Sequence, residues 1–295
     1  MREQENYYSS PDASLDAESP GVDSERAEVD DPTTFVDTIV QMFNLYPQVF
    51  LGLIGYYLAF LFVLAFGVGV MAAFGFALAE LQPFLMGLAI LVGGVLYFLT
   101  IAYFWTVAFT YLDKVYHGLP TNSVWSESTD KFGSVAGSML LQTLVLTPFA
   151  GFALVVFTLS EASVGAMCFG ALCMLAGYAT YLLFHFADLA VITEDTSIVD
   201  SMNRSLQLVG GVRNWFYTVA LFIAAWLIGV AAMMPVMLVV VGAELAVGEA
   251  NPILGAVLTG GIQFAMGLLL YPFYAVANYV VFRSLVARNR SQQGF

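Results

Sequence analysis

His185 and Asp188 are the two residues of this sequence whose types and spacing most readily suggest chemistry. Three positions apart on a helix, their side chains share a face, and Tyr181 lies on that face one turn earlier. An ionisable pair at membrane depth marks a transport pathway, an intramembrane enzyme centre, or a polar partner for another helix. Because this pair falls at the end of an apolar segment, where water reaches it, we favour a structural hydrogen bond.

Three side-chain amides lie inside apolar segments, namely Gln142, Gln263 and Asn278. An amide in hydrocarbon needs a hydrogen-bond partner, so we expect these residues to bond across helices. No acidic or basic residue occupies the centre of an apolar segment, which argues against a proton-coupled pump or a voltage sensor. The lack of such residues does not argue against a passive carrier of a neutral substrate.

Pro148, Pro235 and Pro272 interrupt three of the apolar segments. Each proline removes a backbone hydrogen bond and can kink its helix. Transporters use broken helices to build a site in the middle of the membrane, so a carrier or channel for a small or lipid-like substrate is one interpretation. Bent helices without such a role are commoner, and transport is therefore our second choice.

Arg204 and Arg213, together with Lys131, could gather into a cationic cluster for anionic lipid headgroups. Three cations spread over two loops are a weak signal, because positive charges beside membrane spans commonly serve only to set the topology. We favour the topological role.

The sequence lacks the motifs of soluble enzymes. It has no phosphate-binding loop with its lysine, no metal-spaced set of histidines and carboxylates, and no serine–histidine pair in a recognisable turn. Cys168 and Cys173 are five residues apart and face different sides of a helix, which favours packing over a disulfide or a metal site. We therefore predict no catalytic, cofactor or metal site, no nucleic-acid partner, and a protein that is not an enzyme.

The elements that must position these residues are long and apolar. Hydrophobic residues make up 60% of the chain and charged residues 11%, against about 25% charged residues in soluble domains. A membrane-spanning helix needs about 20 apolar residues. We therefore predict an all-α polytopic membrane protein, with a six-helix transmembrane bundle in residues 32–284. The predicted spans are 50–79, 84–112, 134–160, 162–185, 214–243 and 253–282.

The basic residues predict the orientation of these spans. With both termini in the cytoplasm, every lysine and arginine falls on the cytoplasmic side, and the outer loops carry acids instead. This is the positive-inside pattern, which an added or missing span would destroy. We expect a multi-pass protein of the cell (plasma) membrane. The basic residues are Arg2, Arg26, Lys114, Lys131, Arg204, Arg213, Arg283, Arg288 and Arg290, and the outer acids are Glu80, Glu161, Glu244 and Glu249.

The two ends of the chain are polar tails. Residues 1–31 carry ten acidic residues against two arginines, and they have too little apolar surface to offset the entropy of ordering. We predict a disordered cytoplasmic tail there and a short basic tail at 285–295. An acidic tail in a protein with two lysines among nine basic residues suggests a halophilic source. An ordinary solvated tail explains the acids equally well.

Residues 194–215 predict a short amphipathic helix that lies on the membrane surface and leads into the fifth span. Weaker copies begin near Thr33 and Asn122, each before a pair of spans. We therefore predict three interfacial helices on the cytoplasmic side and a three-fold repeat of surface helix plus helical hairpin. Chance repetition is the alternative. The expected apolar face is Ile198, Val199, Met202, Leu206 and Val209; the expected polar face is Asp200, Ser201, Asn203, Arg204 and Gln207.

Residues 188–215 resemble the signature of a six-span membrane family. It includes the membrane domain that precedes the catalytic barrel of some bacterial glycerophosphodiester phosphodiesterases, and many related uncharacterised prokaryotic membrane proteins, among them halophile ones. A proline that often precedes the acidic pair is missing here, and about a dozen residues follow the sixth span. The resemblance therefore implies the membrane module without the enzyme. It is carried by Glu194, Asp195, Arg204, Ser205, Leu206, Gly210 and Trp215.

The sequence thus predicts a non-catalytic integral membrane protein, a scaffold or organiser of lipids or partner proteins. The lipid bilayer is its expected partner, with anionic lipid headgroups or other membrane proteins as further candidates. A carrier or channel is the alternative.

Overall fold

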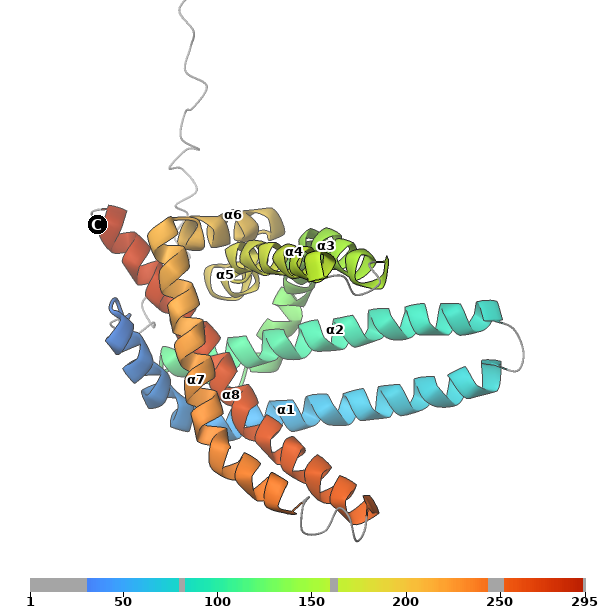
Figure 1. Ribbon diagram of the computed structural model, residues 1–295. Helices are drawn as coiled ribbons and strands as arrows, with labels where there is room; N and C mark the ends of the chain where they lie inside the picture. Colours follow the sequence, from blue (N-terminus) through green and yellow to red (C-terminus); the bar gives the residue numbers. More distant parts are fainter. Residues whose placement is uncertain (1–30, 80–82, 160–163, 244–251, 294–295) are drawn as a thin grey trace, which may run out of the picture.

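The computed structural model describes residues 31–79, 83–159, 164–243 and 252–293. Every regular secondary-structure element in these residues is a helix (Figure 1). The predicted tail at 1–30 and the predicted outer acids Glu80, Glu161, Glu244 and Glu249 lie outside the described residues. The helices are α1 (Phe35–Ala79), α2 (Pro83–Tyr116), α3 (Val124–Leu159), α4 (Val164–Phe184), α5 (Ala187–Glu194), α6 (Ile198–Val209), α7 (Val212–Ala243) and α8 (Pro252–Gln293).

Six of the described helices are long and apolar enough to cross a membrane, which confirms the predicted number of spans. They form three hairpins, α1 with α2, α3 with α4, and α7 with α8. The hairpins meet at one end of the molecule, and their free ends diverge (Figure 1). Large apolar side chains cover the diverging arms, for example Leu51, Phe62 and Leu238, which are strongly exposed. Such surfaces indicate contact with the lipid bilayer.

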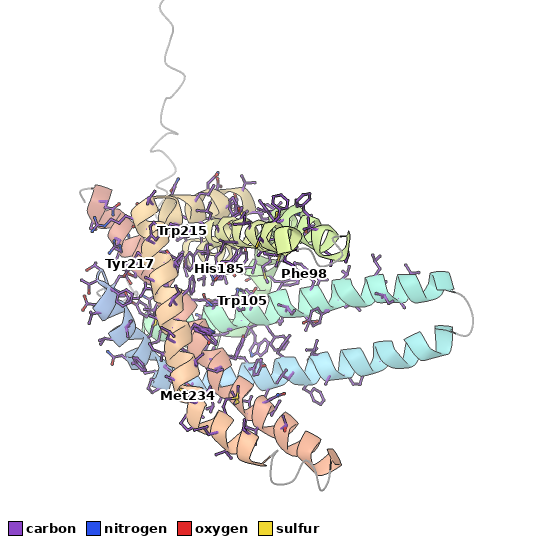
Figure 2. The ribbon with its side chains drawn as sticks, in the orientation of Figure 1. Phe98, Trp105, His185, Trp215, Tyr217 and Met234 are labelled. Atoms are coloured by element: carbon purple, nitrogen blue, oxygen red, sulfur yellow. The ribbon has the colours of Figure 1, made fainter. Side chains whose placement is uncertain are left out.

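The buried core sits where the hairpins meet. It combines the first half of α1, the last half of α2, the whole of α5 and the last half of α8. Figure 2 shows Trp215 and Tyr217 at this end, at the beginning of α7, and Met234 farther along the α7 arm. Seven basic residues of the described chain belong to helix ends or connections at this same end, namely Lys114, Lys131, Arg204, Arg213, Arg283, Arg288 and Arg290.

The chain turns sharply at the end of the fourth span. After α4 ends at Phe184, residues 185–186 form a turn and α5 begins at Ala187. Residues 187–193 are all buried, so α5 is a core element that the sequence analysis did not separate from its surroundings. A helix that is apolar on all sides gives no amphipathic signal, and its short length hides it beside a span.

The predicted surface helix at 194–215 is α6. Ser197 is its N-cap, and its Oγ accepts a hydrogen bond from the Asp200 N–H at 3.2 Å. The residues that α6 buries are Ser201, Ser205, Leu208 and Val209, although Ser201 was expected on the polar face. Part of the expected apolar face, above all Val199, is exposed instead. Exposed apolar residues on a surface helix suit contact with the lipid interface.

The other two surface segments are not separate helices. The first is the beginning of α1, which continues past Pro47 into its span and changes direction early in its length (Figure 1). Its N-cap repeats that of α6, because Thr34 Oγ1 accepts from the Asp37 N–H at 3.2 Å. The second is the beginning of α3, where Ser123 rather than Val124 precedes the helix and bonds Glu127 at 2.7 Å.

The three prolines do not break their helices. Pro148, Pro235 and Pro272 lie inside α3, α7 and α8, each of which is assigned as one continuous helix. The prediction that they interrupt the spans is wrong in this respect. The helical backbone continues on both sides of each proline. A proline inside a helix removes one backbone hydrogen bond, and the neighbouring turns keep the helix intact.

Candidate functional site

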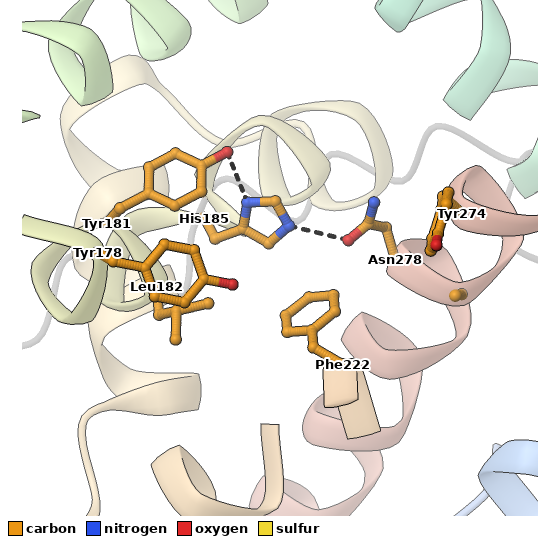
Figure 3. Close-up of a pocket in the computed structure, with 8 residues that line it drawn as sticks. Tyr178, Tyr181, Leu182, His185, Phe222, Tyr274 and Asn278 are labelled. Carbon is orange, nitrogen blue, oxygen red and sulfur yellow. Dashed lines mark hydrogen bonds between the residues drawn. The ribbon is translucent and has the colours of Figure 1, made fainter. Parts of the chain in front are cut away.

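His185 lies in the turn between α4 and α5 and links α4 to α8. Its Nδ1 is 2.9 Å from the Tyr181 hydroxyl, and its Nε2 is 2.9 Å from Asn278 Oδ1 (Figure 3). An amide oxygen can only accept, so Nε2 carries a proton and donates it to Asn278. Both ring nitrogens therefore have a hydrogen-bond partner.

Asp188 points to a different partner. It lies in the first turn of α5, is buried, and accepts a hydrogen bond from Trp105 Nε1 of α2. His185 and Asp188 each make a structural hydrogen bond, but with different partners, although the two groups are close enough to interact electrostatically. The reason is the turn at 185–186, which ends α4 before Asp188 and removes the shared helix face.

A pocket of about 270 Å³ opens beside His185, between α4 and the α7–α8 pair. We call it the polar pocket, because Tyr178, Tyr181 and Tyr274 surround it together with His185 and Asn278 (Figure 3). Phe222 of α7 covers its remaining side.

Two apolar pockets adjoin the polar pocket at Tyr178. The α7 branch, also about 270 Å³, shares Phe222 with the polar pocket and extends to Ile223 and Trp226. The α3 branch, about 340 Å³, runs between α3 and α4 along Leu146 and Phe149. The three pockets together are the α4 groove. Among the described residues that line it, none is a lysine, arginine, aspartate or glutamate.

The α4 groove lies between the α3–α4 hairpin and the α7–α8 hairpin, which pack on one another less closely than the other neighbouring hairpins do. The α1–α2 hairpin contacts both of the others, because α2 packs on α3 and α1 packs on α8, whereas α4 packs on α3 and α6. Tyr178, Ile223 and Trp226 are each more than half exposed, so the groove can be reached from the side of the molecule. In a membrane, that side faces lipid.

The predicted cationic cluster is largely neutralised. Arg204 makes two hydrogen bonds to Glu194, of 2.7 and 2.9 Å, and Lys131 pairs with Asp195 at 2.8 Å. Both cations therefore hold the C-terminal end of α5, where a positive charge also suits the helix dipole. Arg213 is exposed at the beginning of α7.

The three amides differ in their partners. Asn278 bonds across helices, as expected, through His185. Gln142 is buried but its amide nitrogen bonds Ser138 of its own helix at 3.4 Å, and Gln263 is exposed on α8. The expectation of a cross-helix hydrogen bond is thus wrong for both glutamines within the described part of the chain.

A second buried polar cluster escaped the sequence analysis. Asp31 binds Arg283 through two hydrogen bonds, of 3.0 and 2.9 Å, and accepts a third from the Tyr116 hydroxyl at 2.9 Å. Next to it, the Tyr279 hydroxyl donates to Asp113 at 2.7 Å. Asp31 was assigned to a disordered tail because acidic neighbours precede it, and only the charges at the ends of α2 and α8 could have hinted at a partner.

Cys168 and Cys173 are free thiols, and Cys168 is exposed. Across the described residues, no group of three or more histidine, cysteine, aspartate or glutamate side chains could hold a metal ion.

Comparisons with protein-family models, with curated proteins and with solved structures gave no match. Any functional conclusion therefore depends on the geometry of the chain itself.

Proposed function

We propose that this protein is a non-catalytic integral membrane protein that organises lipids by holding a lipid molecule in the α4 groove. The observation that supports this proposal is that His185, Asn278 and three tyrosines gather in one of three adjoining pockets, whereas mainly apolar side chains line the other two. A molecule that fits such a space is amphipathic, and in a bilayer the abundant amphipathic molecules are lipids.

Three finer features belong to the same proposal. Both termini lie in the cytoplasm of a cell-membrane protein, since the basic residues gather at one end of the bundle. The chain consists of three repeats of surface segment plus hairpin, which the matching N-caps at Thr34 and Ser197 support. The resemblance to the six-span family, on the residues around Glu194 and Arg204, is in keeping with a membrane module.

Lipid retention in a blocked groove tests the proposal. Ile223 lies in the α7 branch and is 53% exposed, so Ile223→Trp should fill the groove without disturbing the core. Ile90 on α2 is 64% exposed and lies outside the groove, which makes Ile90→Trp the matched control. Native mass spectrometry should show a retained lipid on the wild type and on Ile90→Trp, and a several-fold smaller amount on Ile223→Trp. Equal retention by all three proteins would contradict the proposal.

A carrier for a small or lipid-like substrate is the second candidate function. The lateral opening of the groove favours it, because a lipid could enter from one leaflet. Proline-broken helices no longer support transport, because α3, α7 and α8 continue through Pro148, Pro235 and Pro272. Lipid flux in reconstituted vesicles, with Pro272→Ala as one variant, would decide, and the absence of flux above that of empty vesicles would dismiss this candidate.

A further inference from the structure

We infer that the α4 groove selects a two-chain lipid with an uncharged, hydroxyl-bearing head, of the diacylglycerol class, over phospholipids. This inference rests on the proposed function and adds the chemistry of the ligand. Three properties of the groove support it: the hydroxyl and amide groups in its lining, the absence of a cation there, and its branched shape.

The polar groups of the groove suit a hydroxyl and ester carbonyls. Tyr181 and His185 are occupied with one another and with Asn278. The Asn278 amide nitrogen and the hydroxyls of Tyr178 and Tyr274 make no hydrogen bond within the described part of the chain, and these residues line the polar pocket. They offer neutral donors and acceptors, which match uncharged polar groups of a ligand.

The charges around the groove disfavour a phosphate. No cation of the described residues lines the groove, and Arg204 and Lys131 are paired with Glu194 and Asp195. A phosphate placed here would lose its water without gaining a positive partner, which is unfavourable.

The shape of the groove suits two chains. Residues of α4 and α7 line the α7 branch, residues of α3 and α4 line the α3 branch, and Tyr178 is the residue that all three pockets share. Trp226 lies in one branch and Phe149 in the other, so each branch offers an aromatic wall to an acyl chain. One head with two diverging chains would fill all three pockets at once.

Trp226 makes the inference testable, because bromine on a lipid chain quenches the fluorescence of a tryptophan that it touches. The full-length protein is reconstituted in phosphatidylcholine vesicles that contain a small, equal fraction of brominated diacylglycerol, brominated phosphatidylglycerol or brominated phosphatidylcholine. Trp226→Phe, measured in parallel, subtracts the signal of the other tryptophans. We expect brominated diacylglycerol to quench Trp226 several-fold more strongly than either phospholipid.

Two tyrosine variants connect the selectivity to the polar pocket. Tyr178→Phe removes one hydroxyl of the pocket without breaking a hydrogen bond of the described chain, so it should fold and lose much of the preference. Tyr97→Phe changes an exposed tyrosine of α2 outside the groove and should keep the preference. A preference that survives in Tyr178→Phe would overturn the assignment of the polar pocket.

The remaining outcomes separate the inference from the proposed function. Stronger quenching by either brominated phospholipid would leave a lipid in the groove but overturn the uncharged head. Equal quenching by all three lipids would overturn the inference, because the groove would then select no lipid. The proposed function would still be decided by the lipid retention of Ile223→Trp.

Discussion

At the scale of single residues, the hydrogen bonds of His185 explain how the polar pocket keeps its shape. The imidazole connects Tyr181 on α4 with Asn278 on α8, so it fixes two walls of the pocket relative to one another. An imidazole with a hydrogen bond at each nitrogen holds these two walls in place.

Replacing Asn278 should weaken this connection. In Asn278→Leu the Nε2–H of His185 loses its acceptor, and an unpaired polar group costs about 1–3 kcal/mol. We expect a lower midpoint of thermal unfolding in detergent. Gln263→Leu removes an exposed amide of the same helix and should leave the midpoint unchanged. Equal midpoints for the two variants would show that the hydrogen bond does not stabilise the fold.

The ion pair between Asp31 and Arg283 should matter more than any other described pair. Both side chains are largely buried, with 8% and 12% of their surface exposed. Asp31→Asn removes the carboxylate that accepts two hydrogen bonds from the buried arginine, and breaking a buried pair costs about 3–5 kcal/mol. The matched change Glu127→Gln breaks the more exposed pair with Lys114 and should cost less than about 1 kcal/mol.

Measurement of both variants by thermal unfolding at low and high salt would check this prediction. The destabilisation by Asp31→Asn should persist at high salt, because salt screens buried pairs far less than exposed ones. A loss of stability in Asp31→Asn that is no larger than the loss in Glu127→Gln would contradict the prediction.

At the scale of elements, the corner formed by α4, α5 and α6 positions the groove. Ser205 of α6 donates to the Leu183 carbonyl at 2.7 Å and accepts from the Phe186 N–H at 3.2 Å. One buried hydroxyl therefore satisfies the backbone on both sides of the turn that carries His185. The small side chain of Ser205 allows this close approach, which explains why a serine lies among the buried residues of α6.

The connection between α6 and α7 predicts a matched pair of glycine variants. A Cβ on Gly210 would lie 2.4 Å from the Leu206 carbonyl oxygen, whereas a Cβ on Gly211 would meet nothing within 4 Å. Gly210→Ala should therefore cost about 1–3 kcal/mol and Gly211→Ala no more than about 0.5 kcal/mol. Thermal unfolding of the two variants checks this, and similar midpoints would mean that the corner adapts without strain.

At the scale of the whole molecule, three hairpins join at the end that holds the basic residues and the buried core. The lipid-facing surfaces of the diverging arms can stay apolar because the bilayer satisfies them, so the protein needs a packed core only where the hairpins meet. This arrangement leaves room for a lateral groove between two arms without exposing backbone to lipid.

The orientation of this molecule is open to a direct test. In a background with Cys168 and Cys173 replaced by serine, Ser291→Cys should resist a membrane-impermeant maleimide in intact cells, and Glu80→Cys should react. The physical reason is that the positive charges at the α8 end are retained in the cytoplasm during insertion. Labelling of Ser291→Cys from outside would reverse the proposed topology.

The sequence by itself determined the number of membrane-spanning helices and the surface helix α6. Each of these depends on residues within one short segment, such as the apolar run of a span. The end of α4 was predicted within one residue, yet the buried helix α5 that follows was not, because a short apolar helix has no periodic signal of its own.

Only the tertiary structure decided the partners of the functional side chains. His185 was paired in sequence with Asp188, three residues away, but its hydrogen bond goes to Asn278, which lies 93 positions along the chain. Asp31 and Arg283 are separated by 252 positions. Such contacts depend on which hairpins pack together, and so does the α4 groove, because its walls come from helices that share no local pattern in the sequence.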